Sequence, residues 1–118
     1  MSYLAQFMTV LVGLIHLYFM YLEMFLWQTP RGRKIFRTSE SQARDSAVLA
    51  ANQGLYNGVL GAGLIASLFL PDAIGIRIFC FVFIVVVGAY GAMTVTKRIF
   101  WIQSLPALLA ILAHLALY

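Results

Sequence analysis

Two ionisable side chains of different chemistry, His16 and Glu23, lie seven residues apart in a largely apolar segment. Residues seven apart lie on one face of a helix, about 10 Å apart along its axis. This separation is too long for a direct hydrogen bond and suits the two ends of one bound molecule. Glu23 is also the only acidic residue in any predicted membrane span, and such groups often mark a functional site. The alternative is a structural role, in which Glu23 accepts hydrogen bonds from Asn52 or Gln53 and locks two helices together.

The second candidate feature is the segment Asn52–Gly58, which holds three carboxamide side chains within six residues. Carboxamides both donate and accept hydrogen bonds, so they suit a polar ligand whose orientation must be fixed. The chain has four long apolar segments, each expected to cross a membrane as a helix. When each residue is placed by its depth along its helix, at about 1.5 Å per residue, the polar groups of all four gather in the half that is expected to lie nearer the cytoplasm. The other half is almost wholly apolar, apart from Ser67 and His114. The predicted ligand-binding residues are His16, Glu23, Asn52, Gln53, Tyr56, Asn57, Tyr90 and Gln103.

Small residues recur at spacings that let helices approach closely. Gly54 and Gly58 form a GxxxG pair, and Ala62 continues the row four residues later. Gly88 and Ala92 have the same spacing in the third apolar segment. We expect these five residues to pack helices, within one subunit or between subunits.

The sequence predicts neither a metal site nor a cofactor. It contains no cluster of His, Cys or carboxylate ligands with the spacing of a structural metal site. His16 and His114 are predicted to differ in depth by about 14 Å, so they cannot share one haem or one metal ion.

Four apolar segments position these groups, at about residues 3–27, 47–70, 76–96 and 99–118. The 118-residue chain is 63% hydrophobic and 10% charged, whereas soluble domains are about 25% charged. A core of this size cannot hide so much apolar surface, which argues against a soluble enzyme, a disordered tail and a nucleic-acid-binding module. About 20 apolar residues cross a bilayer as a helix, because lipid requires each segment to satisfy its own backbone. We therefore expect one all-α domain over 1–118, an antiparallel bundle of four transmembrane helices.

The basic residues predict the topology of this bundle. Five of the eight Lys and Arg residues lie in the loop at about 28–46, two more are Lys97 and Arg98, and the second loop holds only Arg77. The positive-inside rule places the first and third loops in the cytoplasm and both termini outside a bacterial inner membrane. Ser39 and Gln42 have the spacing of a capping box, so the second helix is expected to begin near residue 40.

Several strings together resemble a bacterial family of small four-helix membrane proteins known only as a domain of unknown function. They are His16 with Tyr21–Trp27, then Asn52–Gly58, Gly88–Ala92 and Gln103–Pro106, in the same order over nearly the whole chain. The resemblance implies a four-helix membrane protein and supplies no reaction or catalytic residue. Some members carry the label epimerase, but nothing here resembles the glycine-rich nucleotide loop of a sugar-nucleotide epimerase.

Three functions are consistent with these features. The first is binding and transport of a small polar or cationic solute by a homo-oligomer, with Glu23 as a proton-linked carboxylate. The second is a membrane enzyme for a lipid-soluble substrate, with Glu23 and His16 as acid and base and the amides polarising a carbonyl or hydroxyl. The third is a small assembly subunit in which the polar groups only fix helix register. All three place the protein in a lipid bilayer and none involves nucleic acid.

Overall fold

The computed structural model describes all 118 residues and is entirely helical, which confirms the predicted all-α class. The four long elements are α1 (Tyr3–Phe25), α4 (Ala47–Ala66), α5 (Ile74–Thr94) and α6 (Leu105–Ala116), the last preceded by a π-helical turn, η2 (Phe100–Ser104). The short elements are α2 (Pro30–Phe36), α3 (Glu40–Asp45) and a 3-10 turn, η1 (Ser67–Phe69). By length and composition, α1 and α5 are each able to cross a membrane, whereas Phe100–Ala116 is a shorter apolar helix.

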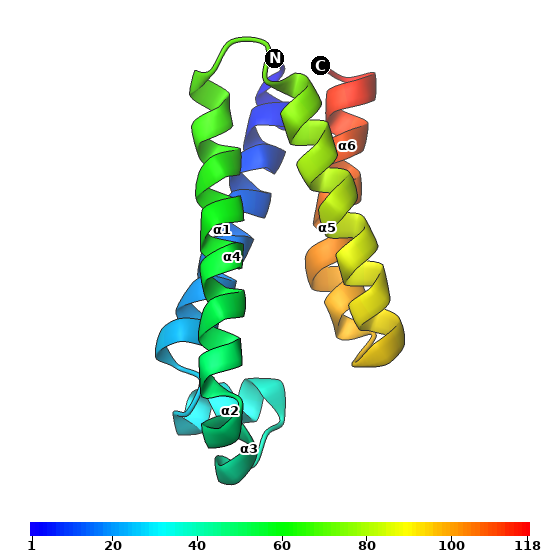
Figure 1. Cartoon of the computed structure of the whole chain (residues 1–118). Coiled ribbons are helices and arrows are strands. Elements are labelled where there is room, and N and C mark those ends of the chain that lie inside the picture. Colours follow the sequence, from blue (N-terminus) through cyan, green and yellow to red (C-terminus); the bar gives the residue numbers. More distant parts are fainter.

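The long helices form two antiparallel pairs (Figure 1). One pair is α1 with α4, and the other is α5 with η2 and α6. The pairs meet mainly through α1 and α6, and α4 makes few contacts with α5. Figure 1 shows the pairs close together at the end that holds both termini and diverging toward α2 and α3.

The apolar core lies in the half of the molecule where the pairs meet. It is built from the first turns of α1 and α5, the last turns of α4, and α6, with mostly alanines on the α6 side. Its buried members are Ala5, Met8, Val12, Leu64, Phe81, Ile84, Ala107, Ala110 and Ala113. The opposite half has no comparable core, so the polar groups there are not enclosed by all four long helices.

The α1–α4 contact depends on glycine. Gly54, Gly58 and Gly61 are buried, and a Cβ at Gly61 would lie 2.5 Å from the Gly13 carbonyl oxygen. Within the chain the buried row continues through Gly61, whereas Ala62 is exposed, so its packing role between subunits stays a prediction. Gly61 shares the face of Gly58 because, at 3.6 residues per turn, positions three and four apart both lie near one face of a helix.

Glycine has the same role in the second pair. A Cβ at Gly88 would collide with the hydroxyl of Ser104, and Gly88 is buried while Ala92 is half-buried. The Ser104 hydroxyl donates to the Val85 carbonyl, 3.0 Å away. The π-helical turn ends just before Pro106, a residue without a backbone N–H, and proline commonly coincides with such irregular turns.

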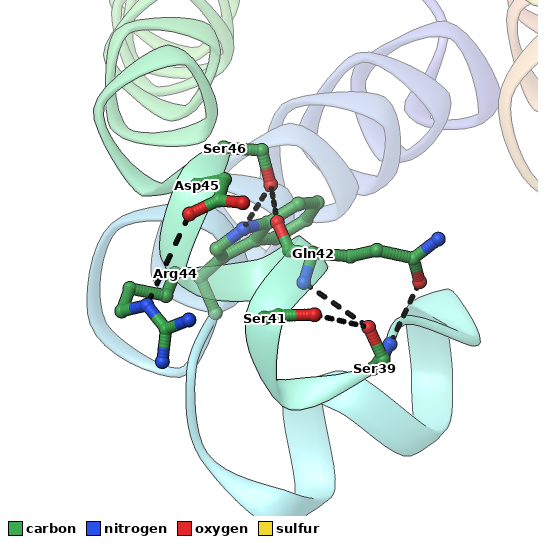
Figure 2. A network of polar contacts seen from close by, with 7 residues as sticks. Ser39, Ser41, Gln42, Arg44, Asp45 and Ser46 are labelled. Carbon is green, nitrogen blue, oxygen red and sulfur yellow. Dashed lines mark hydrogen bonds and ion pairs between the residues drawn. The ribbon is translucent and has the colours of Figure 1, made fainter.

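The predicted capping box is confirmed but begins a different helix. The Ser39 hydroxyl accepts from the Gln42 N–H, and the Gln42 side chain accepts from the Ser39 N–H (Figure 2). The helix that follows, α3, ends at Asp45, and α4 begins separately at Ala47. The second long helix therefore starts at Ala47 and not near residue 40.

Candidate functional site

Glu23 is held by Asn57 across the α1–α4 contact. The Asn57 amide donates to Glu23 Oε1 at 2.6 Å. The two helices approach closely enough because Gly54 has no side chain, and a Cβ there would lie 3.1 Å from Glu23 Cβ. The carboxylate therefore has an amide partner, but the partner is Asn57 and not Asn52 or Gln53, as the structural alternative supposed.

Glu23 also lines a pocket of about 260 Å³ at the end of α1. The lining residues are Glu23, Met24, Phe25, Trp27, Gln28, Thr29 and Ala47. Glu23 is the only ionisable side chain among them, and no protein group donates a hydrogen bond to its second oxygen, Oε2. Pockets for drug-sized ligands are commonly about 300–1,000 Å³, and this pocket is smaller, so its volume limits a ligand to a small solute.

The wall of the pocket is fixed by the connection from α1 to α4. The Trp27 indole donates to the Ser46 hydroxyl at 3.0 Å, and that hydroxyl donates to the Gln42 carbonyl (Figure 2). The Thr29 hydroxyl donates to the Leu26 carbonyl and accepts from the Gly32 N–H, which caps α2. These bonds fix both ends of the connection, which supplies Trp27, Thr29 and Ala47 to the pocket lining.

His16 lies apart from this pocket. It is 1% exposed, its Nδ1 donates to the Val12 carbonyl at 2.9 Å, and its Nε2 lies 3.4 Å from the Gln103 amide nitrogen. This pattern fits an imidazole whose Nε2 accepts from Gln103. The structure thus pairs His16 with Gln103 and does not place it in the Glu23 pocket.

The remaining predicted ligand-binding residues are not brought together. Asn52 and Gln53 are exposed, and the Asn52 amide donates to the Val48 carbonyl of its own helix. Tyr56 and Tyr90 are 74% and 70% exposed. Of the predicted set, Glu23 pairs with Asn57 and His16 pairs with Gln103, as two separate contacts.

A second polar cluster lies at the end that holds the termini, where the sequence predicted almost only apolar residues. Arg77 is 2% exposed within α5, rather than lying in a loop. Its guanidinium contacts Ser67 and Tyr118, while His114 Nε2 lies 3.5 Å from the Thr9 hydroxyl. The signal was a basic residue one position inside the start of the third predicted span, at residue 77 of 76–96.

Comparison with known proteins gives the family. The model of the family described as "Protein of unknown function (DUF1304)" matches residues 10–115. The chain belongs to this family. It is also similar to "Uncharacterized protein YpaA" of Lactococcus lactis subsp. lactis (strain IL1403), with 34% identity over 116 residues that cover 96% of this chain and 98% of the relative. No solved structure matches. The resemblance drawn from the sequence motifs is thereby confirmed, and the family supplies no activity.

Proposed function

We propose that this protein is a multi-pass inner-membrane protein that binds a small cationic or polar solute at Glu23 and transports it as a homo-oligomer. The environment of the Glu23 carboxylate is the main support for this proposal. The carboxylate is the only ionisable group in its pocket, with one oxygen held by Asn57 and the other free of protein donors.

Membrane insertion is supported by the apolar surface. Large hydrophobic side chains are exposed along all four long helices, among them Phe7, Val59, Phe79 and Leu112. So much exposed apolar area is typical of a lipid or protein contact. Because α4 is antiparallel to α1 and α6 to α5, a membrane crossed by the two longest apolar helices would be crossed by their partners as well. The basic α2–α3 connection would then lie in the cytoplasm.

A cation suits the pocket because a carboxylate without a basic neighbour needs a counter-charge when it is ionised. Asn57 fixes the orientation of the carboxyl group, so that Oε2 is the oxygen available to a ligand. Two pairs of helices that diverge on one side do not form both gates of a pathway, so transport requires a second copy to complete the route.

The assembly-subunit function remains the second candidate, and the Asn57–Glu23 hydrogen bond favours it, since that bond joins two helices. The enzyme hypothesis has less support. Its acid–base pair requires His16 and Glu23 to face one substrate, whereas His16 is bonded to Val12 and Gln103 outside the pocket.

Glu23→Gln, with Glu40→Gln as a matched control, separates the two candidates. Glu40 is exposed on α3 and does not line the Glu23 pocket. We expect methylammonium, choline, Na⁺ or K⁺ to raise the thermal midpoint of the wild type and the control in detergent, and not that of Glu23→Gln. In proteoliposomes, flux of the same cation should fall at least tenfold in Glu23→Gln alone. A Glu23→Gln protein that loses stability, while no cation shifts any variant, would move the assembly function to first place.

A further inference from the structure

Arg77 is a buried cation without a carboxylate partner. It is among the largest fully buried side chains, and the only ion pair in the chain joins Arg44 to Asp45 at the surface. An unpaired buried charge is expensive, and buried charges are normally paired. The cost calls for a compensating group at this end of the molecule.

The hydrogen bonds of Arg77 leave one edge of its guanidinium with a single long contact. Nη1 donates to the Ser67 carbonyl at 2.9 Å and lies 3.5 Å from the Ser67 hydroxyl. Nη2 makes one long contact, 3.5 Å, to the Tyr118 hydroxyl, and Nε is buried with no partner. Nε and Nη2 point in the same direction and form the fork that binds carboxylate or phosphate in a bidentate manner.

The bond to Ser67 has its own structural explanation, which does not extend to the free edge. A cation near the last carbonyls of α4 and η1 is favourable because those carbonyls carry partial negative charge. This accounts for Nη1. It leaves Nε and Nη2 without a role.

The surroundings of the free edge select an amphiphilic anion. No acidic side chain contacts the guanidinium. Exposed apolar side chains lie on the segments around it, namely Phe69 and Leu70 before the α4–α5 turn, Ile76 in α5 and Leu117 after α6. Tyr118 is half exposed and lies beyond the end of α6. Its hydroxyl covers Nη2 at 3.5 Å, and its ring packs beside His114 with the centroids 5.9 Å apart.

We propose that the Nε/Nη2 edge of Arg77 binds the oxyanion of an amphiphile, a phosphate or carboxylate group, after the Tyr118 hydroxyl moves aside. The apolar part of the ligand lies on the exposed side chains near the α4–α5 turn. In a membrane this end of the bundle meets the headgroups of one leaflet, so a phospholipid phosphate is the expected source. The inference does not depend on a role for Glu23.

The test uses delipidated protein in detergent with three probes: short-chain phosphatidylglycerol, decanoate and inorganic phosphate. Binding is measured by native mass spectrometry and by the shift of the thermal midpoint. Arg77→Lys keeps a charge and a donor for Ser67 but loses the fork, and Arg98→Lys is the matched control on an exposed arginine. We expect phosphatidylglycerol to bind the wild type and Arg98→Lys equally, and Arg77→Lys at least tenfold more weakly.

The outcomes of this experiment either support the oxyanion site at Arg77 or overturn it. Arg77-dependent binding of phosphate or decanoate, without phosphatidylglycerol, supports the oxyanion site and assigns it a free anion or a fatty acid. Equal binding to Arg77→Lys and the wild type, or no binding by any probe, overturns the proposal and leaves Arg77 as a helix cap. If Arg77→Lys does not fold, Tyr118→Phe carries the test, because removing the hydroxyl from Nη2 must preserve or tighten binding, and weaker binding contradicts the proposal.

Discussion

Glu23 and Arg77 are charged side chains carried by the long helices at opposite ends of the molecule, and their environments differ. Glu23 lies where the two helix pairs diverge, is half-buried, and lines a pocket with one oxygen free. Arg77 lies where the pairs meet, is fully buried, and bonds mainly to a backbone carbonyl. The carboxylate is open to a solute beside it, whereas the guanidinium is reached only if Tyr118 moves.

The difference follows from how the helices pack. At the Arg77 end, alanines on α6 and the start of α1 close the core. At the Glu23 end, the glycines of α4 bring it against α1, while α5 stays apart. The same chain therefore contains a tightly packed charge and an accessible one, and substitutions at the two ends should separate stability from binding.

The largest loss of stability is expected from Arg77→Ala. Truncation removes the packed side-chain stem and the charged donor to the Ser67 carbonyl, which keeps only its 3.3 Å hydrogen bond from the Leu70 N–H. We expect a combined cost of about 3 kcal/mol. Denaturation in mixed detergent measures it, with Arg98→Ala expected to change the unfolding free energy by less than about 0.5 kcal/mol. If the variant is as stable as the wild type, the cost of burying the Arg77 charge equals the stabilisation that its contacts provide.

A somewhat smaller loss is expected from Gly61→Ala, about 2 kcal/mol from overpacking. The new Cβ would lie 2.5 Å from the Gly13 carbonyl oxygen and 3.1 Å from the Leu17 nitrogen, which are backbone atoms. Gly63→Ala is the matched control, because nothing lies within 4 Å of its Cβ. There the gain in helix propensity should stabilise the protein slightly. Equal effects at the two glycines would contradict the close approach of α1 and α4.

The sequence predicted the helices and their caps better than it predicted which polar side chains contact one another. The helical class, the capping box and the importance of Gly54 and Gly58 all follow from local spacing. The partner of Glu23 does not, because the rotation of α4 about its axis is set by glycine contacts and by the Trp27–Ser46 bond.

The burial of Arg77 is a second feature that the sequence did not predict. With the third span predicted to begin at about residue 76, Arg77 lies at its boundary and is assigned to the loop, whereas α5 begins at Ile74 and buries the side chain. A shift of two residues at a helix boundary thus changes a topology signal into a buried group. The His16–Gln103 contact joins residues that are distant in sequence, so no local pattern reports it.

Asn57→Ala should cost about 1–2 kcal/mol, because it removes the donor to a partly buried carboxylate. Asn52→Ala is the control, since Asn52 bonds only its own helix and is exposed. A double-mutant cycle with Glu23→Gln measures the coupling directly. Coupling near zero would mean that the 2.6 Å bond contributes orientation and no stability.

The smallest change in stability, with a clear change in binding, is expected from Ala47→Met. Ala47 lines the Glu23 pocket, and a longer side chain there takes up space that a solute would use. We expect cation binding to weaken at least fivefold while the unfolding free energy changes by less than about 0.5 kcal/mol, since the added atoms enter open space. Ala66→Met, at an exposed position at the far end of α4, is the control. If both variants bind the cation as the wild type does, the solute reaches Glu23 by a route that does not pass Ala47. The end of the molecule where the helix pairs diverge would then not be the entrance.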